Sequence, residues 1–254
     1  MRAWIVATVC ALALPAGARA DLPDTLWTWR GAPETKTAEL RLFEVGRDTV
    51  GARVRVRYKA LALGLPAGTR LTAWSFPVGV SHGLCLQTGF AVDSAGRVDC
   101  FSRRPAAGDT CARCTLPLDQ IVLAATGYLT AEPYRLGLVS EDAATAVYAE
   151  VFPYPLETRT DSLSLHLELA RADGKQFAVV GEGYPPGEDV GVTIRSDDRS
   201  TGYKMKVPPE GRFRIVVYPQ VADKRTGFAS ITVEHAKRKL TLDWPWGEAA
   251  LKAP

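Results

Sequence analysis

Four cysteines lie within thirty residues of the sequence, at Cys85, Cys100, Cys111 and Cys114. In an exported protein an even cluster of this kind predicts two disulfide bonds, and four cysteines allow three connectivities. A predicted hairpin joins Cys85 to Cys100, which favours a Cys85–Cys100 bond together with Cys111–Cys114. The nested pairing, Cys85–Cys114 with Cys100–Cys111, fits the spacing nearly as well. In either pairing the cluster is a structural staple.

The C-x-x-C spacing of Cys111 and Cys114 also matches thiol–disulfide oxidoreductases and zinc sites. A redox pair has the pKa of its first thiol lowered at the N-terminus of a helix, but the following Thr115-Leu-Pro117 predicts a strand or a loop. A four-cysteine zinc site needs two close pairs, and Cys85 and Cys100 are not such a pair. We therefore expect no metal and no cofactor, with a thiol–disulfide factor as a less favoured alternative.

A second motif, Gly79-Val-Ser-His-Gly83, matches the G-x-S-x-G nucleophile elbow of hydrolases. The elbow needs a helix directly after the serine, whereas Leu84 to Gly89 predicts another strand. The downstream histidines, His166 and His235, are on a predicted strand and in a predicted turn far along the chain. The motif therefore predicts a tight turn, and we assign no catalytic residue.

Basic side chains alternate with apolar ones over residues 52–59. Arg53, Arg55 and Arg57, followed by Lys59, lie on one face of the predicted strand, about 6.6 Å apart. Such a stripe could bind an acidic polysaccharide or the phosphates of a lipopolysaccharide. The alternative is a solvated face, or an edge strand whose charges prevent aggregation.

Two pairs of tryptophans lie near the two ends of the mature sequence, Trp27 with Trp29 and Trp244 with Trp246. In an extended chain residues two apart share a face, so each pair could form a flat platform. Exposed tryptophans stack on sugar rings or anchor protein interfaces. The alternative is that the pairs cover the apolar ends of the folded domains, since tryptophan is mostly buried. We keep both pairs, with the arginines, as candidate binding residues.

The elements that position these residues are predicted to be β-strands. Apolar and polar residues alternate with a period of two from Glu39 onward, which indicates antiparallel strands with one face in a core. No stretch has the pattern of a long amphipathic helix, so the sequence predicts an all-β fold of two β-sandwich domains. Besides residues 52–59, the strands predicted in the first half are 69–76, 84–92, 97–101, 118–126, 134–139 and 145–152.

A second unit begins near Asp161, after a proline-marked segment at 151–155. Seven short strands fit within it, which is the number in an immunoglobulin-like sandwich. These strands are 163–170, 176–183, 189–195, 203–207, 212–217, 228–234 and 238–243. The stretch Gly181-Glu-Gly-Tyr-Pro-Pro-Gly-Glu188, followed by Val190 and Val192, resembles the opening motif of bacterial immunoglobulin-like domains. The resemblance implies an exported or surface protein with binding or spacing as a common role, and no catalytic residue.

A secretory signal peptide is predicted at the start of the chain. Arg2 is followed by the apolar run Ala3 to Leu14 and by the cleavage pattern Ala18-Arg-Ala20. We expect the following organisation: a signal peptide at 1–20, an N-terminal β-sandwich domain with the cysteine cluster at 21–155, an immunoglobulin-like domain at 161–247 and a tail at 248–254.

Composition excludes several classes of protein. The chain has 254 residues and a formal net charge of +3, and without residues 1–20 the balance falls to 29 basic against 28 acidic side chains. A near-neutral protein lacks the positive potential of a nucleic-acid binder. No later segment has the roughly 20 apolar residues of a membrane span. An oxidising compartment, periplasmic or extracellular, suits the cysteines.

Together these observations predict a secreted or periplasmic protein of the bacterial envelope that binds or scaffolds without catalysis. The expected partner is a glycan or a protein, contacted through the tryptophan pairs or the arginine face. No set of residues supplies a nucleophile, a base and an orienting group together. The alternative is a hydrolase or lyase acting on envelope polysaccharide, because paired carboxylates on distant strands are not recognisable in a sequence.

Overall fold

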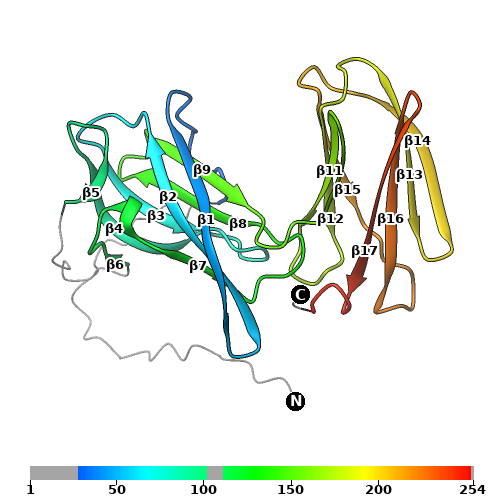
Figure 1. Cartoon of the computed structure of the whole chain (residues 1–254), viewed down its shortest axis with the longest axis horizontal. Helices are drawn as coiled ribbons and strands as arrows, with labels where there is room; N and C mark the ends of the chain where they lie inside the picture. Colours follow the sequence, from blue (N-terminus) through cyan, green and yellow to red (C-terminus); the bar gives the residue numbers. More distant parts are fainter. Residues whose placement is uncertain (1–27, 102–110, 253–254) are drawn as a thin grey trace, which may run out of the picture.

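The computed structural model describes residues 28–101 and 111–252, which form an almost entirely β structure. The strands make four sheets. Figure 1 shows these sheets in two groups, one built from residues 39–151 and the other from residues 157–247. The predicted all-β class is confirmed.

The first group is a sandwich of a three-stranded and a six-stranded sheet. The smaller sheet has the order β1 (Glu39–Val50), β2 (Arg53–Leu63) and β7 (Leu123–Thr126). The larger sheet has the order β5 (Val98–Cys100), β4 (Leu84–Val92), β3 (Arg70–Ser75), β8 (Tyr134–Ser140) and β9 (Ala146–Val151), and β6 (Ala112–Arg113) pairs with β4. The short 3-10 helix η1 (Leu118–Gln120) precedes β7.

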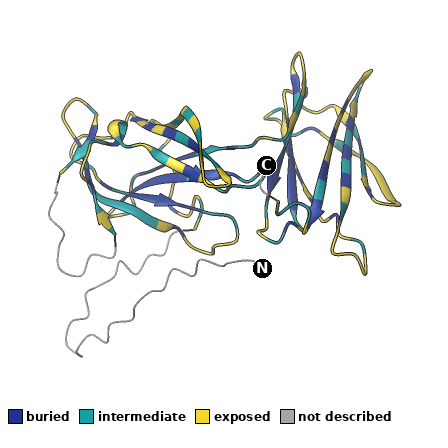
Figure 2. Cartoon of the chain, turned by 60° about the horizontal axis from the view of Figure 1, so that its bottom comes forward, coloured by how far each residue is buried: buried dark blue, intermediate teal, exposed yellow. Residues whose placement is uncertain are grey.

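The core of the first sandwich lies between its two sheets. Leu40 of β1 and Ala60 of β2 are buried in one cluster with Leu71, Phe90 and Leu136 of the larger sheet. These residues come from the apolar positions of alternating strands, so the other positions of β1 and β2 face outward. The burial view shows this alternation as dark and light segments along the strands (Figure 2).

The second group is a sandwich of two four-stranded antiparallel sheets. One sheet has the order β10 (Glu157–Thr160), β11 (Leu163–Leu169), β12 (Phe177–Glu182) and β15 (Arg212–Val217). The other has the order β14 (Arg199–Lys206), β13 (Asp189–Ser196), β16 (Thr226–His235) and β17 (Arg238–Gly247). From β11 onward, the first, second and fifth strands share one sheet, and the third, fourth, sixth and seventh share the other. This is an immunoglobulin-like arrangement.

Most strand positions agree with those predicted from the sequence, with several differences. β1 and β6 were not among the predicted strands, and β2 continues to Leu63 rather than ending at 59. The segment 118–126, predicted as one strand, is η1 followed by β7, because Pro117 and the turn after it interrupt the ladder. β10 is an additional strand, which pairs with β11. β14 begins at Arg199 rather than 203, and β17 continues to Gly247 rather than ending at 243.

The disulfides have the connectivity that the sequence did not favour. Cys85 is bonded to Cys111 and Cys100 to Cys114, with Cα atoms 5.6 and 5.7 Å apart. Both favoured pairings were therefore wrong. The reason is that β6 adds in parallel beside β4, with Ala112 opposite Gln87. The chain thus returns in the same direction as β4. Cys111 therefore meets Cys85 on β4, and Cys114 meets Cys100 on β5.

The two sandwiches meet through the segment that precedes β8. Ala131 is buried in the core of the second sandwich, and its carbonyl oxygen accepts a hydrogen bond from the backbone N–H of Leu169 at 2.7 Å. Leu129 packs against the same core. The rings of Phe152 and His166 lie 5.6 Å apart across the junction. These contacts hold the second sandwich against the first.

Within residues 28–101 and 111–252, no helix is long and apolar enough to cross a membrane.

Candidate binding cleft

A cleft of about 550 Å³ lies between the two sandwiches. Its lining combines aromatic and apolar side chains with four arginines and three glutamates. The first sandwich and the segment before it contribute Trp29, Arg30, Arg135 and Glu150; the second contributes Glu168, Met205, Pro208, Glu210, Arg212, Phe213 and Arg214. Clefts at domain junctions with a few convergent polar groups are common ligand sites.

The alternation of β11 and β15 explains why the second sandwich supplies charged groups to this cleft. Leu165, Leu167 and Leu169 face the core, so His166 and Glu168 face outward. On β15, Phe213 and Ile215 face the core, and Arg212 and Arg214 therefore lie on the same outer surface as Glu168. The charged groups of two strands meet there.

Glu168 is the most buried charged side chain of the cleft, with 7% of its side chain exposed. Arg214 Nη2 donates a hydrogen bond to Glu168 Oε2 at 2.8 Å, and His166 Nε2 lies 3.5 Å from Oε1. Burial alone would raise the pKa of Glu168, but the hydrogen bonds from His166 and Arg214 and the charge of Arg214 lower the pKa to about 2. Glu168 is therefore an ionised acceptor at neutral pH.

Each arginine of the cleft has a carboxylate partner. Arg135 Nε donates to Glu150 Oε2 at 2.5 Å, and these two residues are direct cross-strand neighbours on β8 and β9. Arg212 pairs with Glu182 at 3.1 Å, and Arg30 with Glu34 at 3.8 Å. Glu210 is exposed and has no ion-pair partner among the described residues. The cleft consequently offers donors and acceptors side by side without an excess of positive charge.

Trp29 forms part of the wall of the cleft. Its ring centroid lies 5.3 Å from that of Phe76 and 5.2 Å from that of Tyr148, which places one side of the indole in the first sandwich. The guanidinium carbons of Arg30 and Arg135 are 5.5 and 5.3 Å from the ring centroid, within cation–π distance. The indole is half-buried and held from several sides. Its partner in the predicted pair, Trp27, lies outside the described residues.

The pair Trp244 and Trp246 does not form a surface platform. The two residues are 1% and 0% exposed and belong to the core of the second sandwich, where Trp244 lies 5.9 Å from Phe177. Neither indole N–H meets an acceptor among the described residues. The platform prediction for this pair was wrong, because β17 runs through Gly247 and so places both alternate positions on its inner face. The alternative had the tryptophans buried at the apolar ends of the domains; both are buried, but within the core of the second sandwich.

The arginine stripe lies where the alternation predicted, on the outer face of the β1–β2–β7 sheet. Arg53, Arg55 and Arg57 alternate with Val56 and Tyr58, which are buried. Arg55 is bound to Asp48 of β1 by two hydrogen bonds of 2.8 and 2.5 Å. The stripe does not line the cleft, so the structure separates the predicted arginine site from Trp29.

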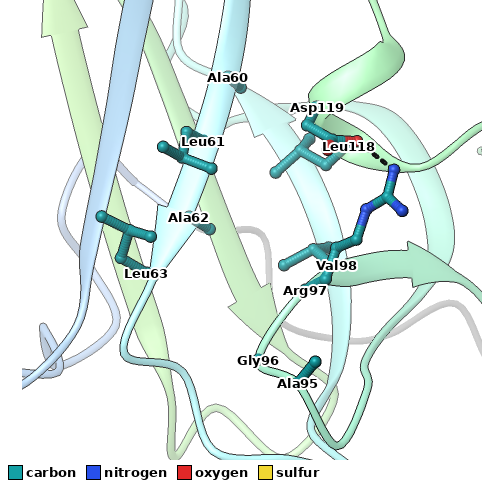
Figure 3. A pocket seen from close by; sticks show the side chains of 10 residues that line it. All are labelled: Ala60, Leu61, Ala62, Leu63, Ala95, Gly96, Arg97, Val98, Leu118 and Asp119. Atoms are coloured by element: carbon teal, nitrogen blue, oxygen red, sulfur yellow. Dashed lines mark hydrogen bonds and ion pairs between the residues drawn. The ribbon is translucent and has the colours of Figure 1, made fainter.

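A smaller groove of about 180 Å³ runs along the end of β2, shown in Figure 3. Leu61 and Leu63 of β2 are on one side and the turn before β5 is on the other. An ion pair of 3.0 Å between Arg97 and Asp119 lies on the side opposite β2. β7 pairs with β2 only from Arg55 to Tyr58, which leaves the end of β2 uncovered here.

The remaining chemical motifs are structural. Cys111 and Cys114 are bonded to other cysteines, so the C-x-x-C pair does not form the disulfide that a thiol–disulfide factor would use. The segment from Gly79 to Gly83 is a turn followed by β4, as its sequence predicted, and no helix holds Ser81. Among the described residues, no three His, Cys, Asp or Glu side chains converge as metal ligands.

Among the described residues, one carboxyl group has a raised pKa, which is what a general acid requires. Burial raises the pKa of Glu132, although the hydrogen bond from the backbone N–H of Leu129 acts in the opposite direction. That hydrogen bond, 2.9 Å long, closes the turn at the junction of the sandwiches. Glu132 does not line the cleft. We therefore interpret Glu132 as a structural residue of this turn.

Sequence reasoning missed most of the cleft. Arg135, Glu150, Glu168, Glu210, Arg212 and Arg214 were not candidate residues. The alternation of apolar and polar residues in β11 and β15 predicts that Glu168 and Arg214 lie on an outer face, so this part of the cleft could have been found from the sequence. The information that the outer face meets the first sandwich depends on contacts between residues far apart in the chain.

No family model matches the sequence, and no curated protein sequence matches it. Among solved structures, the chain is similar to the tetra-tandem repeat in the extending region of a large adhesion protein, with 8% sequence identity and a TM-score of 0.25. The match covers 84% of this chain and 50% of that one, so the chain spans about half the length of the structure it matches. A TM-score this low says nothing about what the protein binds.

Proposed function

We propose that this protein is an exported, non-catalytic binding protein of the bacterial cell envelope, and that the cleft around Trp29 binds a glycan. The predicted signal peptide at residues 1–20 and the two disulfides support export. The proposal depends mainly on one observation: the cleft between the sandwiches alternates guanidinium and carboxylate groups beside a tryptophan.

The pairing of charges favours a neutral, hydroxyl-rich ligand over a polyanion. Arg135 and Arg214 are neutralised by Glu150 and Glu168, so an anionic ligand would have to displace a carboxylate. A sugar hydroxyl both donates and accepts, and it can therefore bridge a guanidinium and a carboxylate that already face each other. The indole of Trp29 adds an apolar surface of the kind that packs on a sugar ring.

The charge state of Glu168 favours binding over hydrolysis within this cleft. Glycoside hydrolysis needs one carboxyl group that holds a proton near neutral pH and a second carboxylate close to it. The pKa of Glu168 is about 2, so this group does not hold a proton. Glu210 is exposed to solvent. The cleft thus contains carboxylates suited to accepting hydrogen bonds.

A glycan array probed with the mature protein tests the proposal, together with two variants of the cleft. Glu210→Gln replaces an exposed acceptor that has no ion-pair partner in the described structure, so it leaves the fold intact. A hydrogen bond to a charged group contributes about 1.5–3 kcal/mol, and we expect binding to weaken by about tenfold or more. Trp29→Ala should weaken binding as well, with circular dichroism recorded to verify folding.

Glu141→Gln is the matched control, because Glu141 is an exposed glutamate in a turn outside the cleft. It should bind as the unmodified protein does. An array without any bound glycan, or binding that neither cleft variant changes, would show that the cleft is not a glycan site.

A further inference from the structure

We propose that a second surface, separate from the cleft, docks on an anionic lipid bilayer. This surface is the outer face of the β1–β2–β7 sheet, and its characteristic residues are Arg53, Arg57, Lys59, Phe43, Leu61 and Leu63. We refer to it as the outer face. It combines cations without ion-pair partners and exposed apolar side chains on one sheet.

The register of the sheet places these residues on one side. On β2 the even positions Val56, Tyr58 and Ala60 are buried in the first sandwich, so the odd positions face away from it. Phe43 of β1 lies directly opposite Lys59. Leu61 and Leu63 lie opposite Arg41 and Glu39, which form an exposed ion pair with each other. The outer face therefore continues from its unpaired cations to three exposed apolar side chains with one neutralised ion pair among them.

The charge of the outer face is positive and only partly compensated. Arg55 is neutralised by Asp48. Arg53 and Lys59 are exposed and have no carboxylate within ion-pair distance in the part of the chain that the structure describes. Arg57 has none there either, but it is half-buried and its Nε is covered. Because the chain without residues 1–20 has 29 basic against 28 acidic side chains, this positive charge is a local property of the outer face. Cations arranged on a flat sheet can contact several lipid phosphates at once.

The exposed apolar side chains of the outer face favour a bilayer over an acidic polysaccharide. Phe43 is 45% exposed, Leu61 37% and Leu63 41%. A polysaccharide chain with carboxylate or sulfate groups would satisfy the cations but offers little to aliphatic side chains. A bilayer satisfies both, since its phosphates meet the cations and its interface accepts apolar side chains to a depth of about 5–10 Å.

Co-sedimentation with vesicles of phosphatidylglycerol mixed with phosphatidylcholine tests the proposal, with pure phosphatidylcholine vesicles for comparison. We expect the protein to bind the anionic vesicles and to be released by salt. The double variant Arg53→Gln with Lys59→Gln should bind roughly 25-fold more weakly, at about fivefold for each cation removed. Phe43→Ser with Leu61→Ser, which alters only exposed side chains, should also weaken binding by about tenfold.

The control is Arg199→Gln with Lys204→Gln on β14, which removes the same charge from an exposed strand of the other sandwich. This variant should bind as the unmodified protein does. Equal loss in the control, no binding to anionic vesicles, or binding to an acidic polysaccharide such as dextran sulfate with none to vesicles would overturn the proposal. Persistence of vesicle binding in the Phe43 and Leu61 variant would also contradict it.

Discussion

Glu168 and Arg214 form an ion pair of 2.8 Å that spans β12, joining the strands on either side of it. Beneath the pair lie Ala178 and Val180 of β12, which are fully buried although they are on the outer side of their sheet. The ion pair thus forms part of a cover over an apolar surface where the two sandwiches meet.

The stability of the fold should fall in acid because of Glu168. Its pKa is about 2 in the folded protein and near the ordinary value of 4.5 when unfolded. A depressed pKa stabilises the folded state above the unfolded value, and this contribution is lost as the pH falls from about 4.5 to 2. We expect Glu168→Gln to lower the free energy of unfolding at neutral pH by about 2–3 kcal/mol and to flatten its pH dependence in that range.

Urea denaturation at a series of pH values measures this effect. Glu182→Gln is the matched control, because Glu182 pairs with Arg212 at an exposed position on the neighbouring strand. An exposed pair contributes about 0–1 kcal/mol, so the control should differ little from the unmodified protein. If both variants lost the same free energy of unfolding, the buried ion pair of Glu168 would contribute no more than an exposed one.

Gly227→Ala should destabilise the second sandwich. A Cβ atom added at Gly227 would lie 2.7 Å from the indole of Trp246, a rigid ring that is fully buried. Overpacking of this kind costs about 1–3 kcal/mol. Gly202→Ala on β14 is the control, since its nearest atom would be 3.7 Å away. Chemical denaturation that gives the same midpoint for both variants would contradict the packing described for Trp246.

Tyr148→Phe should loosen the segment that carries Trp29. The hydroxyl of Tyr148 accepts a hydrogen bond from the N–H of Ala32 at 3.1 Å and donates one to its carbonyl at 3.2 Å, both in a buried position. Loss of the hydroxyl leaves two buried backbone groups without partners, at a cost of about 1–3 kcal/mol. Glycan binding should weaken with it. Tyr218→Phe, at a residue that is 58% exposed, should change neither property.

Peptide mapping without reductant should recover Cys85 joined to Cys111 and Cys100 joined to Cys114. Recovery of a Cys111–Cys114 bond would contradict this connectivity. Cys100→Ser with Cys114→Ser should lower the free energy of unfolding by about 3 kcal/mol, the value expected for a closed loop of about 15 residues. The variant should retain the Cys85–Cys111 bond in the same map.

Local patterns predicted most of the strands because most of them have one face in a core. β4 and β15 have the bounds that alternation and flanking turns indicated, 84–92 and 212–217. β10 was missed because its residues Glu157–Thr160 are mainly polar and exposed, so no apolar period marks it. A strand held only by its ladder with β11 leaves little trace in the sequence.

The errors share one physical origin, which is dependence on contacts between distant residues. The cysteine spacing suggested a hairpin bond, but the parallel pairing of β6 with β4 decides which sulfur atoms meet. The sequence does not show which face of β17 points inward, because that face is determined by pairing with β16 and by the opposite sheet. Trp244 and Trp246 were therefore considered as surface residues. The cleft lies between two sandwiches, and local sequence patterns do not predict how the two sandwiches contact each other.

The interleaved disulfides have a consequence for solubility. β6 and β5 together cover the outer side of β4, at Gln87–Thr88 and at Phe90–Val92, and the two bonds fasten this short cover in place. A two-residue parallel ladder has little stability of its own. In a reduced chain the departure of β6 would expose the backbone of β4 around Gln87 and Thr88 as a template for another molecule. The two disulfides therefore protect this edge of the sheet against self-association.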